Sequence, residues 1–177
     1  VEAAAAAAAA LPAAAAAAFA ALVILGFGGF VFYNTNVLNR YRTSYEAELV
    51  QAEYERQYKR FEDLAQPRLI GVELHVELYP ERRHADVEGQ YRIVNRTGEA
   101  IDSVHLRIPG EVEIGRLALD RTAEQVLNDR RHGYHILKLA QPLQPGDSAR
   151  LEFELSFGVR GFANSERLLE LVENGTF

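Results

Sequence analysis

Hydrophobic and polar positions change their spacing along the chain, and each spacing predicts a different kind of element. Residues 13–32 carry no charge and are mostly apolar. About twenty apolar residues in a helix are enough to span a hydrocarbon core of roughly 30 Å. The polar residues 33–36 that follow contain no small-residue cleavage site of the kind that ends a signal peptide. This segment therefore predicts one transmembrane helix.

Residues 37–65 contain neither glycine nor proline and repeat apolar side chains every three or four positions. This spacing predicts an amphipathic helix that ends before Pro67. Two successive apolar stripes lie along it: Leu38, Tyr41, Tyr45, Leu49 and Ala52, then Tyr54, Tyr58, Phe61 and Ala65. We expect the helix to change its packing partner between the stripes. We also expect the tyrosines to pack against the chain's own domain rather than to bind a ligand.

From residue 68 the spacing changes to two, which is the period of β-strands. In residues 69–79 the apolar side chains at positions 70, 72, 74, 76 and 78 share one face, which we expect to be buried. Similar alternation predicts strands within residues 85–93, 104–108, 112–119, 134–139 and 151–157. Only residues 122–130 suggest a helical turn. Closely spaced strands without helices between them predict an antiparallel β-sandwich.

The expected fold class is therefore mainly β with a helical N-terminus, in three parts. Residues 1–36 form the transmembrane helix, residues 37–66 the amphipathic stalk helix, and residues 67–177 the β-sandwich. Within the first part, Ala3–Ala10 and Ala13–Ala18 are uninterrupted alanine runs. We interpret residues 1–18 as unidentified side chains written as alanine, with a true low-complexity tract as the alternative. Because the chain contains no methionine, we expect it to be a fragment.

Charge is confined almost entirely to the part that follows the apolar segment. The chain has 19 basic and 25 acidic residues, a net charge of -6, and only Glu2 is charged among residues 1–39. This acidic balance and the lack of a basic stripe argue against nucleic-acid binding. Cysteine is absent, which excludes disulfides, a thiol nucleophile and a cysteine zinc site.

No catalytic, cofactor-binding or metal-binding residue is expected in this chain. The five histidines are His75, His84, His105, His132 and His135, and none lies in a His-Glu-x-x-His helix motif. Gly133 interrupts any helical platform between His132 and His135. The serines at positions 44, 103, 148, 156 and 165 lack a Gly-x-Ser-x-Gly context. The glutamate pairs 73/77 and 152/154 are expected on solvated strand faces, and the sequon-like motifs at Asn95 and Asn174 are expected to be turns.

Two long stretches resemble a known family. Residues 33–110, which begin YNTNVLN, and residues 127–165, which contain the Leu143-x-Pro-Gly-Asp turn, are similar to bacterial ABC transporter permeases fused to an aminopeptidase N-like zinc metallopeptidase ectodomain. The closing NGTF extends the resemblance, which then covers residues 33–177. It implies a twisted sandwich that packs on the peptidase domain and helps to wall its peptide cavity. The zinc ligands and the amine-anchoring loop of that family lie in the next domain, after Phe177.

The resemblance also implies partners and a location. The partners are the lipid bilayer, the remaining permease helices, the peptidase domain, an ATP-binding subunit and a peptide substrate. It places residues 37–177 on the periplasmic side of the bacterial inner membrane, although Arg40 and Arg42 would favour the cytoplasmic side. Two alternatives remain open: a degenerate peptidase-like ectodomain that binds or guides an exported substrate, and a single-pass adhesion or assembly sandwich.

Overall fold

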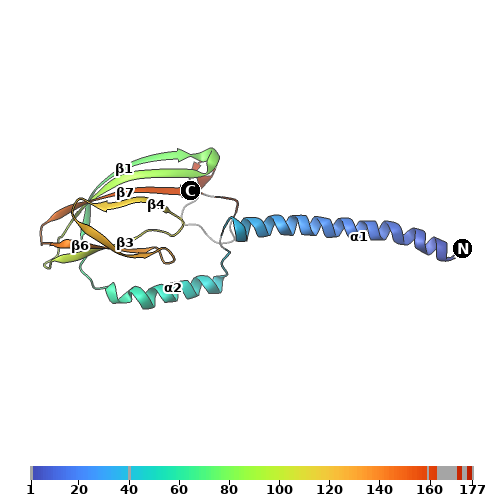
Figure 1. Ribbon diagram of the computed structural model, residues 1–177, viewed down its shortest axis with the longest axis horizontal. Coiled ribbons are helices and arrows are strands. Elements are labelled where there is room, and N and C mark those ends of the chain that lie inside the picture. Colours follow the sequence, from blue (N-terminus) through green and yellow to red (C-terminus); the bar gives the residue numbers. More distant parts are fainter. Residues whose placement is uncertain (1, 40, 159, 163–170, 173–174, 177) are drawn as a thin grey trace. The chain divides into compact units, whose positions relative to one another are not determined.

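The computed structural model describes residues 2–39, 41–158, 160–162, 171–172 and 175–176 (Figure 1). It divides into two compact units. The first contains residues 1–42 and 160–166, and the second contains residues 43–159 and 167–177.

The first unit is built around the long helix α1 (Glu2–Phe32), which continues into a π-helical turn (Tyr33–Val37). Within the described residues, Ala14–Val37 is the one segment long and apolar enough to cross a membrane. Its large side chains are exposed along the whole length, as Phe19 (70% exposed) and Leu25 (71% exposed) illustrate. In length and composition, this helix agrees with the expected transmembrane segment.

The helix expected over residues 37–65 is shorter in the structure. Its regular part, α2, spans Ser44–Tyr58 and ends in a 3-10 turn, Lys59–Phe61. Thr43 starts it with a capping box, because the Glu46 backbone N–H donates to Thr43 Oγ1 (3.1 Å) and the Thr43 N–H donates to Glu46 Oε2 (3.0 Å). The Thr-x-x-Glu spacing in the sequence is a signal for the start of a helix. Because Thr43 caps the first turn of α2, the residues just before it are not helical.

The second unit contains two larger antiparallel sheets and a short pair of strands. The larger sheet has the order β1-β2-β7-β4 and the smaller one the order β3-β6-β5. Their strands are β1 (Arg68–Tyr79), β2 (His84–Val94), β3 (Ile101–Arg107), β4 (Glu113–Leu119), β5 (Ala123–Asp129), β6 (Tyr134–Leu143) and β7 (Ser148–Gly158). The short pair consists of β8 (Leu171–Val172) and β9 (Gly175–Thr176), which run antiparallel. The expected fold class, mainly β with a helical N-terminus, is confirmed.

One expected helical turn is a strand instead. Residues 122–130 contain β5, which pairs with β6 so that Ala123 lies opposite Leu139 and Gln125 opposite Leu137. This pairing gives the backbone of β5 its hydrogen-bond partners, and it places partly buried Ala123 against the core. Pairing with β6 therefore overrides the weak local preference of residues 122–130 for a helical turn.

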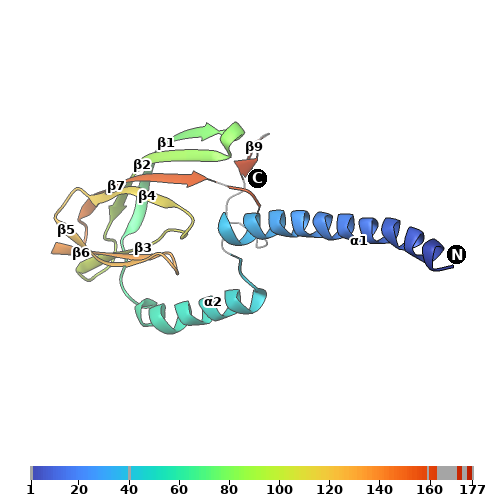
Figure 2. The ribbon, with the colours of Figure 1, turned by 45° about the vertical axis from the view of Figure 1, so that its right-hand side comes forward.

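The core lies between the two sheets. It consists of Ile93, Ala149 and Leu151 from the larger sheet, and of Ile101, Val104, Leu137, Leu139 and Leu143 from the smaller one. Figure 2 shows the resulting layers, with α2 on the far side of the smaller sheet. The layers therefore follow the order larger sheet, smaller sheet and α2.

Asn95 is fully buried at the edge of this core, in the first sequon-like motif. Its side-chain N–H groups donate to the backbone oxygens of Leu143 (2.8 Å) and Glu99 (2.7 Å), and its Oδ1 accepts from Thr97. The expected turn at Asn95 is confirmed, and the fully buried amide is not available as a glycosylation acceptor. Asn174 and Ser165 lie outside the described residues.

The apolar face of β1 is open to solvent, contrary to expectation. The register places Val72 opposite Tyr91, and Leu74 opposite Gly89, so the expected face is correct. However, Leu74 is 52% exposed, and the buried core cluster draws no residue from β1. The reason is that β1 is an edge strand, and the smaller sheet packs on the part of the larger sheet built from β2 and β7.

We expect Leu74→Asp and Leu151→Asp to have very different effects. Leu151 is 2% exposed, so a carboxylate there would cost several kcal/mol and unfold much of the protein. At half-exposed Leu74 the carboxylate remains solvated, and the sandwich should stay folded. Urea unfolding followed by circular dichroism measures both effects, and equal destabilisation would show that the face of β1 is buried.

Candidate functional site

The most unusual surface of the described sandwich is the side of β1 that carries Val72, Leu74, Val76 and Leu78, called here the open apolar face. These four side chains are 47% to 52% exposed. Soluble proteins rarely expose a contiguous apolar patch unless it binds another surface. The open apolar face is therefore the first candidate for a functional site.

Gly89 makes this face continuous with the core. It lies on β2, opposite Leu74 on one side and Phe153 of β7 on the other. A Cβ atom at position 89 would come within 2.6 Å of Leu74 Cδ2 and 2.8 Å of Phe153 Cζ. The bare backbone thus allows the two side chains to approach each other across β2. The apolar surface runs without a break from exposed Leu74 to Phe153, which is 5% exposed.

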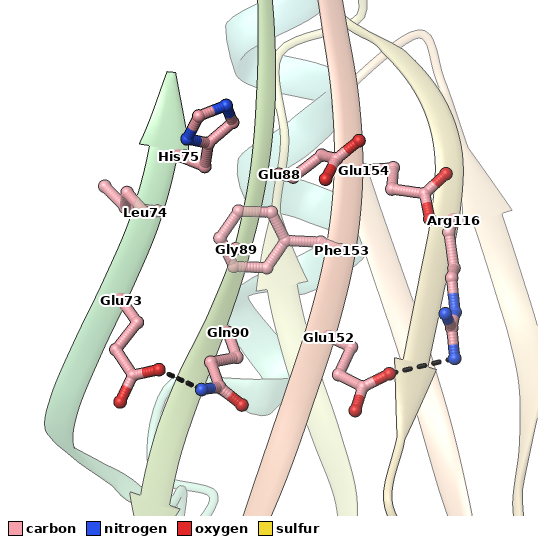
Figure 3. A pocket seen from close by; sticks show the side chains of 10 residues that line it. All are labelled: Glu73, Leu74, His75, Glu88, Gly89, Gln90, Arg116, Glu152, Phe153 and Glu154. Atoms are coloured by element: carbon pink, nitrogen blue, oxygen red, sulfur yellow. Dashed lines mark hydrogen bonds and ion pairs between the residues drawn. The ribbon is translucent and has the colours of Figure 1, made fainter.

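The opposite side of the same sheet carries an acidic groove of about 420 Å³ (Figure 3). Glu73, Glu88, Glu152 and Glu154 project from neighbouring strands there, together with His75, Gln90 and Arg116. Arg116 pairs with Glu152 (2.8 Å), and Gln90 donates to Glu73. No group of three or more potential metal ligands occurs among the described residues. This surface offers solvated carboxylates and no arrangement of nucleophile and base.

A second cluster attaches α2 to the outer side of the smaller sheet. The rings of Tyr58 and Tyr134 stack with centroids 4.1 Å apart, and Tyr54 lies edge-on to Tyr134 at 6.0 Å. Phe61 packs against His105 at 4.9 Å. The expectation that the tyrosines pack on the chain's own domain is confirmed for the second stripe. Tyr41 and Tyr45 of the first stripe are exposed.

Polar contacts complete this attachment, called here the helix latch and formed by Glu53, Tyr58, Asp129, Arg131 and His132. The Tyr58 hydroxyl donates to Asp129 Oδ2 (2.6 Å), and His132 Nδ1 lies 2.6 Å from the same oxygen. Glu53 pairs with Arg131 (2.8 Å). His132 Nε2 is buried without a hydrogen-bond partner, 3.7 Å from Glu53. His132 thus has a structural partner in Asp129 that its spacing from His135 did not suggest.

The helix latch shifts the pKa values of Asp129 and Tyr58. Burial by itself would raise the pKa of Asp129, but hydrogen bonds from Tyr58 and His132 outweigh it and lower the pKa to about 2. Burial, followed by the bond to Asp129, raises the pKa of Tyr58 above its usual value. Asp129 is therefore ionised and Tyr58 is a neutral donor near pH 7, which is the combination that strengthens their hydrogen bond.

The structure does not bring the five histidines together. His135 is buried in the sandwich beside Gln125, and burial lowers its pKa. His105 lies between Ser103 and Tyr134, and burial lowers its pKa too. His75 is exposed beside Glu77.

His84 has a serine and an aspartate as neighbours, which invites comparison with a catalytic triad. However, Ser156 Oγ (3.3 Å) and Asp86 Oδ1 (3.0 Å) both approach the same ring nitrogen, Nε2. A triad needs them on opposite nitrogens, so that the ring can take the serine proton while the aspartate holds the other side. This geometry does not support serine nucleophile chemistry.

Comparison with known proteins gives a limited result. No protein-family model and no curated protein matches the chain. Similar solved structures include an M1 zinc metallopeptidase from Deinococcus radiodurans and a mutant two-domain M1 zinc metallopeptidase bound to L-arginine. Each is 15% identical with a TM-score of 0.44, and the match covers 54% of this chain and 21% of the other. Such a score does not establish a common fold, and the chain spans about a fifth of those proteins.

Removing the Tyr58 hydroxyl tests the helix latch. We expect Tyr58→Phe to lower the free energy of unfolding by about 1–3 kcal/mol at pH 7, because the partly buried Asp129 carboxylate loses a donor. Tyr45→Phe, at a tyrosine that is 68% exposed, is the matched control and should change little. Chemical denaturation of both variants gives the comparison.

Tyr58→Phe should also change how the stability of the protein depends on pH in the acidic range. The pKa of Asp129 is about 2 in the folded protein against a usual 3.8. Its stabilising contribution is therefore complete above about pH 5, and is lost as the pH falls through 4 towards 2. Tyr58→Phe should flatten this part of the stability profile, and an unchanged slope would contradict the assigned role of the latch.

Proposed function

We propose that this chain is the junction and non-catalytic N-terminal ectodomain of a bacterial ABC transporter permease fused to an aminopeptidase N-like zinc metallopeptidase. In this proposal α1 is the last membrane helix before the ectodomain. The sandwich scaffolds the peptidase domain and helps to wall its peptide cavity. The family resemblance of residues 33–110 and 127–165 and the apolar length of α1 support this assignment.

The open apolar face carries the proposal. Each Å² of apolar surface removed from water contributes about 25 cal/mol, so covering four large side chains on one strand gives a stable contact. Because Gly89 connects this face to the core, a domain that packed on β1 would continue the existing core rather than form a separate patch. A scaffold for a neighbouring domain needs such a surface, whereas an isolated soluble sandwich does not.

The remaining parts of the proposal follow from the resemblance. Zinc belongs to the peptidase domain of the parent protein, and the ATP-binding subunit and permease helices are its other partners. We keep the division into a membrane helix (1–36), a stalk (37–66) and a sandwich (67–177) as part of the proposal. A degenerate peptidase-like ectodomain and a single-pass assembly module are the alternatives. A His-Glu-x-x-His motif followed by a glutamate after residue 177 would favour the intact peptidase. Loss of this motif would favour the degenerate peptidase-like ectodomain. A stop codon at that point would favour the single-pass assembly module.

Charge placed on the open apolar face tests the scaffold role. We expect Leu74→Glu combined with Val76→Glu to leave the sandwich folded but to lower the thermal stability and the aminopeptidase activity of the parent protein. The matched control is Glu73→Gln with Glu77→Gln, which alters the opposite face of the same strand. Equal activity of both double variants would argue that β1 does not contact the peptidase domain.

A topology measurement tests the proposed location. The chain contains no cysteine, so Arg83→Cys or Asp147→Cys introduces a single thiol at a turn between strands. We expect a membrane-impermeant thiol reagent to label it in spheroplasts before lysis, because the proposal places residues 37–177 in the periplasm. Labelling only after lysis would put the sandwich in the cytoplasm, and would favour the assembly-module alternative.

A further inference from the structure

β1 is an outer strand of the larger sheet, and its outer edge differs from those of the other outer strands (Figure 3). The outer strands β3, β4 and β5 are each 7 residues long, and a register shift interrupts the pairing of each. Short lengths and bulges of this kind hinder the addition of another strand to a sheet edge. β1 is 12 residues long, contains neither lysine nor proline, and pairs regularly with β2 from Gly71 to Tyr79. From Gly71 onward it therefore lacks the features that protect the other edges.

The edge of β3 is also covered by a side chain. Gln66 Oε1 accepts from the His105 backbone N–H (2.9 Å), and Gln66 Nε2 donates to the Ser103 carbonyl (3.3 Å). Within the part of the chain that the structure describes, β2 is the one strand that pairs with β1. The backbone groups on the outer side of β1 therefore have no strand partner among these residues.

The geometry around Gly89 shows which backbone groups of β1 face outward. A Cβ atom at Gly89 would come within 2.7 Å of the Glu73 carbonyl oxygen, so this oxygen points towards β2. In an antiparallel pair, both backbone groups of one residue point to the same side, and the side alternates along the strand. The groups that point away from β2 are therefore those of Val72, Leu74, Val76 and Leu78. These are the residues of the open apolar face.

A strand that paired with this edge would have to match both sides of β1. Its side chains would alternate between the open apolar face and the side of the acidic groove, so every second residue would be apolar and the others polar. A second copy of β1 does not meet this requirement. In an antiparallel pair centred on His75, Glu73 of one copy would lie opposite Glu77 of the other, and like charges in this position are destabilising. The edge is therefore suited to a strand of different sequence.

We propose that a strand of the neighbouring domain pairs along the outer edge of β1 between Gly71 and Tyr79. The inference rests on the proposed function for the identity of this partner, which is the peptidase domain of the parent protein. It adds that the partner extends the larger sheet through backbone hydrogen bonds, besides covering the open apolar face. Backbone pairing also fixes the register of the partner strand, because a shift by one residue would turn its apolar side chains to the wrong side.

Hydrogen exchange of single backbone amides in β1 tests this pairing. The measurement compares this chain with the intact parent protein, both in lipid nanodiscs. In this chain we expect fast exchange at the amides that point away from β2, which are those of Leu74, Val76 and Leu78. The amides of His75 and Glu77 face β2 and should exchange slowly. In the parent protein all of these amides should exchange slowly, which is a change of at least about tenfold for the outward ones.

Val76→Pro and Val76→Ala form a matched pair of variants. Both remove the valine side chain, but only proline also removes the outward N–H. Proline is tolerated in an edge strand where the N–H faces away from the sheet, so both variants should keep the circular dichroism of the sandwich. In the parent protein we expect the amides of Leu74 and Leu78 to stay slow in Val76→Ala. In Val76→Pro they should exchange as fast as in this chain alone.

The outcomes separate the pairing from the scaffold role. Fast exchange of the outward amides in the unaltered parent protein would overturn the pairing, whether or not Val76→Pro folds. If Leu74 is still protected from hydroxyl radicals there, the partner domain covers the open apolar face without pairing, and the scaffold role stands. Loss of both kinds of protection would contradict the scaffold role as well. Equal exchange of Leu74 and Leu78 in the two Val76 variants would also overturn the pairing.

Discussion

The two sheets of the sandwich differ in width, and the open apolar face results from this difference. The four-stranded sheet presents apolar side chains along β1, β2, β7 and β4. The core takes buried side chains from β2 and β7, Leu117 and Leu119 of β4 pack against it, and β1 contributes none. The edge strand β1 therefore keeps four large side chains about half exposed. The uncovered part continues the core, because Gly89 places no side chain between Leu74 and Phe153. A surface of this kind is energetically suited to a partner domain, which is the basis of the proposed scaffold role.

Contacts between residues far apart in the sequence hold each helix within its own unit. The helix latch, with Tyr58 donating to ionised Asp129, holds α2 on the outer side of the smaller sheet. Within the other unit, Asn39 donates to the backbone carbonyls of Arg160 and Phe162. Both contacts join residues that are distant in the sequence, and in both an amide or a hydroxyl donates to a carbonyl or a carboxylate.

Local patterns were sufficient to predict the apolar helix and the strands of the two sheets other than β5, because period-two alternation and twenty uncharged residues are strong signals. They could not predict the exposure of β1, since the alternation of Val72, Leu74 and Val76 defines a face but not what covers it. The Thr-x-x-Glu spacing at Thr43 marks the start of α2, whereas the apolar stripes alone predict a helix that starts earlier. The partner of His132 and the contacts of Asn39 depend on tertiary packing, and no local signal indicates them.

The central claim is that the open apolar face is covered by another domain of the parent protein. Hydroxyl-radical footprinting tests it most directly, because it reports the solvent exposure of individual side chains. We expect Leu74 and Val76 to be oxidised in this chain alone and protected in the intact parent protein. Tyr45, which is 68% exposed on α2, serves as the reference. Equal oxidation of Leu74 and Val76 in both proteins would show that the face stays open, and would contradict the scaffold role.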